Sequence, residues 1–282
     1  MGLIGGSVAL SLKKASRINA ALQIVGIGRT SESLQAALEL GVIDVATSDI
    51  SHALKDADMV LIATPVAQTS TILTAIKPHL SANTVITDAG STKGDVLRCA
   101  EEILGEQFNQ FIGGHPIAGA EKSGVIAATS DLYVNKNVIL TPTLSTNKQA
   151  TLAATQLWQA CGANVSEMSA ETHDSIFAAV SHLPHLLAFA LVDDIASRTN
   201  AAQLFSFAAS GFRDFTRIAG SHPEMWRDIS LANRNALLNE LNAYQEELSQ
   251  LKQLLINEDG AGLQSLFERA SVARNAWVNN KQ

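Results

Sequence analysis

Residues 58–63 form a near-continuous apolar run that ends at a Thr-Pro-Val turn. A strand in a parallel sheet is buried on both faces, so its side chains are apolar throughout and do not alternate. Short apolar runs recur at 23–27, 84–87, 110–112, 138–141 and 165–168, with helical patterns between them, as at 32–40 and 147–161. Strands that alternate with helices predict an α/β fold with a parallel, doubly wound sheet.

The chain changes character after Met168, where the strand pattern stops. We expect one long helix over 170–198, kinked at Pro184 because proline cannot donate a backbone hydrogen bond. Further helices are expected at 211–220, 230–255 and 263–278, and the leucine face of 230–255 must be buried against another surface. The sequence therefore predicts an α/β domain over 1–168 and an all-α domain over 169–282 through which the chain forms a homodimer.

Length and composition limit the class of protein. The 282 residues are 46% hydrophobic, enough for one large or two medium domains. A net charge of −7 argues against a nucleic-acid or anionic-membrane surface, and no apolar run approaches the roughly 18 residues that span a bilayer. Cys99 and Cys161 lie in apolar helical patterns and give no disulfide framework, so we expect a cytoplasmic protein.

The first residues, Gly2-Leu3-Ile4-Gly5-Gly6-Ser7, lead directly into an apolar helix. A glycine turn at a helix N-terminus binds anions through free N–H groups. This turn matches the second half of the dinucleotide fingerprint G-x-G-x-x-G, with Gly2 as the second glycine and Gly5 as the third. A glycine-rich helix start is an equal alternative from these residues alone. We expect the natural chain to begin upstream, with about ten further residues that form an apolar strand ending in Gly-x.

The residue after the strand at 23–27 selects the cofactor in a dinucleotide-binding fold, because an Asp or Glu there binds the ribose 2′-hydroxyl of NAD. Gly28 stands at this position, followed by Arg29, Thr30 and Ser31. A cation with hydroxyls and no carboxylate favours the 2′-phosphate of NADP. If Arg29 is only a solvated loop residue, NAD or both cofactors are used. Because ligands bind beyond strand ends, we also expect Thr64 and Pro65 beside the dinucleotide.

A second glycine-rich stretch, Gly113-Gly114-His115-Pro116-Ile117-Ala118-Gly119, follows the strand at 110–112. Ligands in an open α/β sheet bind outside the carboxyl ends of its strands, so we expect a loop in which His115 faces a ligand crevice. A histidine that only caps a turn is the alternative, because histidine is common in loops. Ser91 and Lys93 follow the strand at 84–87 in the same way, with helix capping and solvation as their alternative roles.

His173, Phe177, Ser181 and His185 are spaced by four and form one stripe along the predicted helix at 170–198, with His182 further round. A metal site needs several ligands with convergent geometry. No carboxylate lies on this stripe, so we expect no metal and a polar stripe that faces a cleft.

Arg213 and Arg217 lie four apart on the short helix at 211–220. Paired guanidinium groups suit a substrate with carboxylates, because each can bind one through two hydrogen bonds. A salt bridge from Arg217 to Asp214 is an alternative that is compatible with this role.

Several stretches together resemble the prephenate dehydrogenase family of tyrosine biosynthesis, which also includes arogenate and cyclohexadienyl dehydrogenases. They are GLIGGS at 2–7, ATPV at 63–66, DAGSTKG at 88–94, GGHPIAGAEKSG at 113–124, SHLPH at 181–185 and GFRDFTRIAGSHPEMWRDI at 211–229. The resemblance covers nearly the whole chain. It implies a Rossmann-type N-terminal domain, whose first strand is missing from this sequence, and a helical C-terminal domain that makes the dimer.

The resemblance implies that prephenate or arogenate is oxidised and decarboxylated while NAD or NADP takes the hydride. His115 resembles the catalytic histidine that accepts the proton of the ring 4-hydroxyl, and Ser91 resembles the serine that hydrogen-bonds this hydroxyl and the histidine. Arg217 resembles the arginine that holds the ring carboxylate. Further positions match the surroundings of the substrate pocket, namely Glu121, His173, His182, His185, Arg213, Asp214 and Trp226. Ala120 departs from the family, which usually has threonine there, and this removes one pocket hydroxyl.

Two other functions stay open from the sequence. One is a non-catalytic, truncated relative that acts as a dimeric metabolite-binding protein. The other is a 3-hydroxyacid or imine reductase on a similar two-domain plan, which would not be expected to carry GGHPIAG together with GFRDFTRIA. Activity with prephenate separates the first of these from an enzyme.

Overall fold

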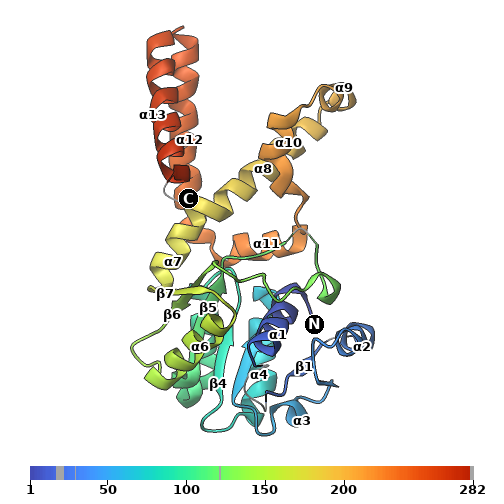
Figure 1. Cartoon of the computed structure of the whole chain (residues 1–282). Coiled ribbons are helices and arrows are strands. Elements are labelled where there is room, and N and C mark those ends of the chain that lie inside the picture. The colour runs from blue at the N-terminus through green and yellow to red at the C-terminus, as the bar shows by residue number, and fades with distance from the viewer. Residues whose placement is uncertain (17–21, 29, 121, 280–282) are drawn as a thin grey trace. The chain divides into compact units, whose positions relative to one another are not determined.

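The computed structural model describes residues 1–16, 22–28, 30–120 and 122–279 (Figure 1). The chain forms two compact units, Met1–Arg234 and Asn235–Gln282, and each is described by itself. The smaller unit contains most of α12 (Arg234–Ile256) and α13 (Gly260–Asn279), two helices joined by a short turn. The predicted helix over 230–255 is therefore wrong at its start, because a preceding helix ends at Ala232 and Asn233 has a non-helical backbone.

The larger unit is built on a mostly parallel sheet. In the main part of the sheet the strands lie in the order β3 (Met59–Ile62), β4 (Val85–Asp88), β5 (Phe111–Pro116), β6 (Asn137–Thr141) and β7 (Asn164–Glu167). A separate parallel pair contains β1 (Val25–Ile27) and β2 (Val45–Thr47), and in the described residues β1 is not paired with β3.

The expectation of a wholly parallel sheet is wrong at one pair of strands. β5 and β6 run antiparallel, whereas the other neighbours in the main sheet are parallel. The connection between them holds a 3₁₀ turn, η4 (Val125–Ala127), and none of its described residues is in an α-helix. Parallel strands need a crossover connection, usually a helix, so a connection of this kind suits an antiparallel return.

Helices cover both faces of the main sheet, as the doubly wound pattern predicts (Figure 1). One face packs against α4 (Thr69–Ile76) and α5 (Gly94–Leu104). The other packs against α1 (Leu3–Ser16) and α6 (Lys148–Ala160). Consecutive residues of β5 belong to opposite clusters, Phe111 to the first and Ile112 to the second, because successive side chains of a strand point to opposite faces.

Two of the smaller elements were not predicted from the sequence. Strand β2 and helix α3 (Ile50–Leu54) were not predicted, because three and five residues are too few to show a period. Thr30 caps α2 (Ser31–Glu39), since the Thr30 hydroxyl accepts the N–H of Ser33 at 3.3 Å. The remaining short turns of the α/β part are η1 (Val66–Gln68), η2 (Lys77–His79) and η3 (Gly105–Gln110).

The helical part of the larger unit begins at α7 (Ala170–Phe177). A π-helical turn, η5 (Ala178–His182), joins it to α8 (Leu183–Ala196). The predicted long helix is therefore present over Ala170–Ala196, but its turn just before Pro184 is π-helical, with the N–H of Leu183 donating to the carbonyl oxygen of Ala178 five residues back. The chain continues through α9 (Ala201–Ser206), α10 (Ser210–Thr216), η6 (Arg217–Gly220) and α11 (Pro223–Ala232).

The expectation that no segment reaches membrane-spanning length needs a correction. The helical stretch Ala170–Ala196 has 27 residues, and an 18-residue window within it reaches a mean hydropathy of 1.7. Only 28% of that window is buried inside the chain. By length and composition alone this is weak evidence for a membrane span, because a helix that packs against another protein surface has the same properties.

We predict that Gly114→Ala destabilises the fold. A Cβ at this position would lie 2.6 Å from the backbone oxygen of Asp88, and a carbonyl in a sheet cannot move away cheaply. Urea unfolding should report a loss of about 2 kcal/mol, the usual effect of forcing extra atoms into a packed site. Gly119→Ala is the control, because nothing lies within 4 Å of a Cβ there. Equal stability of the two variants would contradict this account of the β4–β5 packing.

Candidate active site

A buried ion pair organises the carboxyl end of β4. Asp88 is 2% exposed and Lys93 is fully buried. The Lys93 ammonium is bonded to Asp88 and also donates to the carbonyl oxygen of Gly114 at 2.8 Å. Asp88 accepts the backbone N–H groups of Gly90 at 2.8 Å and Gly114 at 2.9 Å. The alternative of a solvated Lys93 is therefore wrong, and this pair ties the loop after β4 to the strand that carries His115.

His115 lies within β5 and not in a loop as predicted, because residues 113–116 pair with β6. It is near the carboxyl end of its strand, where the sequence placed a ligand crevice. Its Nδ1 is 2.8 Å from Nε2 of His173 on α7, and the Phe177 ring packs against both imidazoles. Burial lowers the pKa of His115 well below its ordinary value, and repulsion from a protonated His173 and from Lys93 would lower it further, so the ring is neutral at pH 7.

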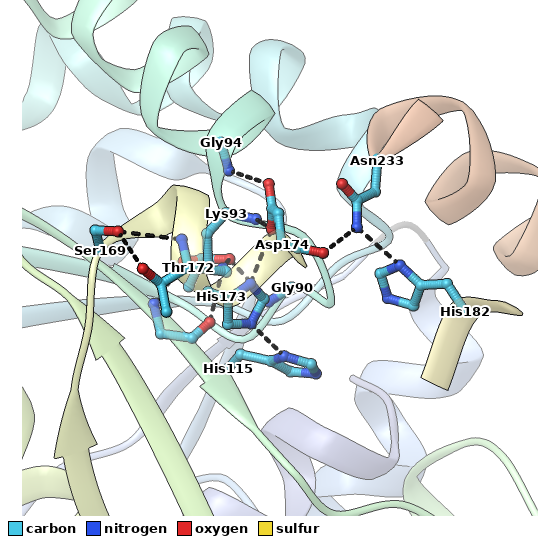
Figure 2. A network of polar contacts seen from close by, with 12 residues as sticks. Gly90, Lys93, Gly94, His115, Ser169, Thr172, His173, Asp174, His182 and Asn233 are labelled. Atoms are coloured by element: carbon cyan, nitrogen blue, oxygen red, sulfur yellow. Dashed lines mark hydrogen bonds and ion pairs between the residues drawn. The ribbon is translucent and has the colours of Figure 1, made fainter. Parts of the chain in front are cut away.

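The line of contacts continues from His173 to Asp174 (Figure 2). Nδ1 of His173 is 2.8 Å from Oδ1 of Asp174. The same carboxylate accepts the backbone N–H groups of Lys93 and Gly94, each at 2.8 Å, at the start of α5. Burial alone would raise the pKa of Asp174, but the hydrogen bonds from His173 and from the two N–H groups bring it below its ordinary value.

A second histidine is joined to this network through Asn233 (Figure 2). The Asn233 amide donates to the carbonyl oxygen of Asp174 at 2.7 Å and lies 3.1 Å from Nδ1 of His182. Burial lowers the pKa of His182 to about 4, against a smaller opposing effect of the Asp174 charge. Nε2 of His182 is buried and has no hydrogen-bond partner among the described residues.

His185, Trp226 and Arg217 extend the same group of residues. The His185 ring stacks on Trp226 with a centroid separation of 3.5 Å, and its Nδ1 is 2.9 Å from the carbonyl oxygen of Ser181. Burial lowers the pKa of His185, the hydrogen bond to the Ser181 carbonyl opposes this, and the positive charge of Arg217 lowers the pKa further. The Trp226 indole nitrogen is buried without a hydrogen-bond partner in the described part of the chain.

The other predicted substrate residues are less connected. Ser91 is half-buried in the bend between β4 and α5, and its backbone acts on the pKa of His182, but no hydrogen bond between its hydroxyl and His115 is found in the described residues. Arg213 and Asp214 are exposed on α10. Glu121 lies outside the described residues.

Four of the predicted cofactor residues lie at the start of α1. Gly2 precedes the helix, and Leu3, Ile4 and Gly5 form its first turn. A Cβ on Gly5 would lie 3.3 Å from Ala63, just after β3, so this glycine allows the close helix–strand approach that the fingerprint requires. The Thr64 hydroxyl at the same edge is buried and has no partner among the described residues, whereas Pro65 is exposed. Thr30 caps α2, and Arg29 lies outside the described residues.

These features fit a bound dinucleotide. The first N–H groups of a helix have no partner within the helix and bind phosphate, and an unpartnered buried hydroxyl calls for a polar ligand atom. No group of three or more His, Cys, Asp or Glu that could hold a metal is found in the described residues.

Sequence reasoning missed Asp174 and Asn233 and undervalued Lys93. One signal was available for Asp174: α5 begins without a side-chain cap of its own, so its N–H groups must find an acceptor elsewhere in the fold. Asn233 gave no comparable signal, because it lay inside a segment that was predicted as continuous helix.

Two family models match the chain. The model for the prephenate dehydrogenase nucleotide-binding domain matches residues 8–167, and the model for the prephenate dehydrogenase dimerization domain matches residues 169–269. The prephenate dehydrogenase of Bacillus subtilis (strain 168) is 40% identical over 277 residues, which are 98% of this chain and 74% of that relative. The cyclohexadienyl dehydrogenase of Zymomonas mobilis is 33% identical over 98% of this chain and 93% of its own length.

Solved structures of enzymes named as prephenate and arogenate dehydrogenases are also similar to this chain. The crystal structure of prephenate dehydrogenase from A. aeolicus in complex with hydroxyphenyl propionate and NAD+ superposes with a TM-score of 0.90 at 39% identity, over 97% of this chain and 94% of that one. The Synechocystis arogenate dehydrogenase gives a TM-score of 0.82 at 29% identity, over 98% and 97% of the two chains.

A Rossmann-type nucleotide-binding domain followed by a helical dimerisation domain defines a two-domain NAD(P)-dependent dehydrogenase. Within that class, the chain belongs to the prephenate dehydrogenase family.

We predict that His182 makes the fold sensitive to mild acid. Its pKa is about 4 in the folded protein, whereas the ordinary value of 6.5 applies to the unfolded chain. Below pH 6.5 the unfolded state binds a proton that the folded state does not, so the free energy of unfolding falls as the pH drops towards about 4, by about 3 kcal/mol from this group.

Urea unfolding of His182→Gln between about pH 7 and pH 4.5 should show a flatter dependence than the wild type. His52→Gln, at an exposed position of α3, should leave the slope unchanged. A wild-type slope in His182→Gln would show that this imidazole does not resist protonation.

Proposed function

We propose that this protein oxidises and decarboxylates prephenate to 4-hydroxyphenylpyruvate, with hydride transfer to NAD+ or NADP+, in tyrosine biosynthesis. The observation that carries the proposal is the neutral, half-buried His115 at the carboxyl edge of the sheet, in a chain of this family. The relatives include enzymes named for prephenate, for arogenate and for cyclohexadienyl substrates. We favour prephenate, because the relatives at 40% and 39% identity are prephenate dehydrogenases, and arogenate is the second candidate.

His115 takes the central role in this reaction. The bound nicotinamide accepts a hydride from ring carbon C4, while His115 accepts the proton of the 4-hydroxyl, which leaves a carbonyl at C4. The C1 carboxylate then departs as carbon dioxide, and its bonding electrons complete the aromatic ring and return a negative charge to the C4 oxygen. His115 gives the proton back to that oxygen, so the same imidazole acts first as a base and then as an acid.

The remaining residues bind and orient the substrate. Arg217 holds the ring carboxylate, and it must do so without stabilising the carboxylate so strongly that carbon dioxide cannot leave. His182 and Trp226 each present a buried nitrogen without a partner in the described residues, and a substrate oxygen is a suitable acceptor for such a group. Ser91 hydrogen-bonds the 4-hydroxyl. His173 has both ring nitrogens engaged, so it acts on the substrate through His115.

Roles further from the reacting carbon follow the same proposal. Glu121, His185, Arg213 and Asp214 surround the pocket. Gly2, Leu3, Ile4, Gly5, Arg29, Thr30, Thr64 and Pro65 contact the dinucleotide, and the Gly28-Arg29-Thr30 sequence favours NADP.

We also propose a homodimer formed through a domain that begins at residue 169. Its support is the dimerization-domain match together with apolar side chains left exposed on the helical part, among them Val180, Phe207 and Leu231 at 67%, 81% and 66% exposure. An unpartnered surface of this kind is typical of an interface between subunits. The free cysteines Cys99 and Cys161 are compatible with a cytoplasmic location.

We predict that His115→Asn abolishes turnover. The amide cannot act as a base, so kcat for prephenate should fall by about 10²–10⁴-fold while KM changes little. The increase in reduced-nicotinamide absorbance with prephenate and each cofactor is the measurement. His52→Asn, the same change at an exposed site, should have wild-type kinetics.

Activity of His115→Asn within about tenfold of wild type would refute the assigned base. A wild-type protein that reduces neither cofactor with either prephenate or arogenate would instead support the non-catalytic alternative.

We predict that Gly28→Asp shifts cofactor preference towards NAD. A carboxylate after β1 can accept the ribose 2′-hydroxyl and repels a 2′-phosphate, so the ratio of kcat/KM for NAD+ to that for NADP+ should rise by about tenfold or more. Gln35→Glu adds the same charge on the exposed face of α2 and should leave the ratio unchanged. An unchanged ratio in Gly28→Asp would mean that another residue selects the cofactor.

A further inference from the structure

The donor and the acceptor of each hydrogen bond around His115 can be worked out by starting from Asp174. Asp174 is ionised at neutral pH, because its hydrogen bonds lower its pKa, and an ionised carboxylate only accepts hydrogen bonds. Two backbone N–H groups at the start of α5 fix its position, with Lys93 bonded to Oδ1 and Gly94 to Oδ2. The carboxylate cannot turn without losing one of them.

The same reasoning then shows which ring nitrogen carries the proton in His173 and in His115. Nδ1 of His173 faces Asp174 at 2.8 Å, so it must carry the proton. A neutral imidazole has one N–H, which leaves Nε2 of His173 as an acceptor. Nδ1 of His115 lies 2.8 Å from that atom and must therefore donate to it. Nε2 of His115 is then the unprotonated nitrogen and the only ring atom of His115 that can act as a base.

We infer that Asp174 is a positioning residue for the reaction: through His173 it holds His115 in the tautomer whose free Nε2 accepts the proton of the substrate hydroxyl. This rests on the proposed role of His115 as the base. In the described residues the Asp174 carboxylate is bonded to His173 and to the backbone N–H groups of Lys93 and Gly94. It also supplies a negative charge at the far end of the chain of rings, which stabilises the positive charge that His115 acquires when it takes the proton.

The other function available to Asp174 is to cap α5, and the two functions predict different results. A cap affects stability and leaves the protons of the imidazole rings where they are. A positioning residue sets which nitrogen of each ring carries the proton, and its loss lowers kcat more than it changes KM for the cofactor.

The test uses the full-length protein with Asp174→Asn and Asp174→Glu. Asp174→Asn removes the charge and permits either ring orientation, so kcat should fall by about a hundredfold or more, while KM for NAD+ or NADP+ changes by less than about threefold. Asp174→Glu keeps an acceptor-only group and should recover a large part of kcat. Asp49→Asn is the matched control, because Asp49 caps α3 by accepting the backbone N–H of His52.

A second measurement begins with the wild-type protein, so part of the test does not depend on whether the variants fold. Nitrogen-15 NMR of histidine-labelled wild-type protein distinguishes the two tautomers, and both His115 and His173 should carry their proton on Nδ1. In Asp174→Asn the two rings should become a mixture of tautomers. A wild-type His115 protonated on Nε2, or an Asp174→Asn variant with unchanged tautomers and unchanged kcat, would overturn the inference. If His115→Asn is inactive and Asp174→Asn is not impaired, only the positioning role fails; if His115→Asn stays active, the proposed base itself fails.

Discussion

The carboxylate of Asp174 is the contact on which the rest of the site depends. It is the acceptor for the first N–H groups of α5, which belongs to the sheet part of the larger unit, and it belongs to α7, the first helix of the helical part. The backbone carbonyl oxygen of Asp174 accepts a hydrogen bond from the side-chain amide of Asn233 at the end of α11. One residue therefore fixes three helices relative to the strand that carries His115. Leaving the N–H groups of a buried helix end without an acceptor would cost about 1–3 kcal/mol for each group, so this contact has a structural reason to persist.

The ion pair of Asp88 and Lys93 fixes the other side of the same imidazole. Both side chains are buried, and burial makes an unpaired charge very costly, so neither can be removed alone without a large penalty. The pair leaves a cation beside His115, and this cation favours the neutral ring that a base requires. The neighbouring histidines act in the same direction, because a second protonated ring beside His115 would repel its positive charge. Burial and the charges around His115 thus keep its ring unprotonated until a group in contact with it donates a proton.

Much of the fold could be predicted from the sequence, because it follows from periodicity. The buried run that became β3 and the helices on both faces of the sheet are set by local hydrophobic pattern. The direction of β6 was predicted wrongly, because strand direction depends on how the chain returns and not on the strand's own residues. The stop between α11 and α12 at Asn233 was missed, since the leucine spacing continues across it. Within the site, His115 could be found from its glycine-rich surroundings, whereas Asp174 is recognisable only when the N-terminus of α5 is brought to it from about eighty residues away.

The π turn at Ala178–His182 changes the direction of the side chains that follow it relative to those before it. In an unbroken α-helix, residues nine apart point in opposite directions, since each residue advances by about 100°. His173 and His182 are nine apart and yet are both buried, at 0% and 1% exposure, because the wider turn between them makes up part of that difference. One residue fewer in this turn would leave every side chain of the site present in the protein and would aim those beyond it elsewhere. The number of residues in a single helical turn thus sets where the side chains beyond it lie.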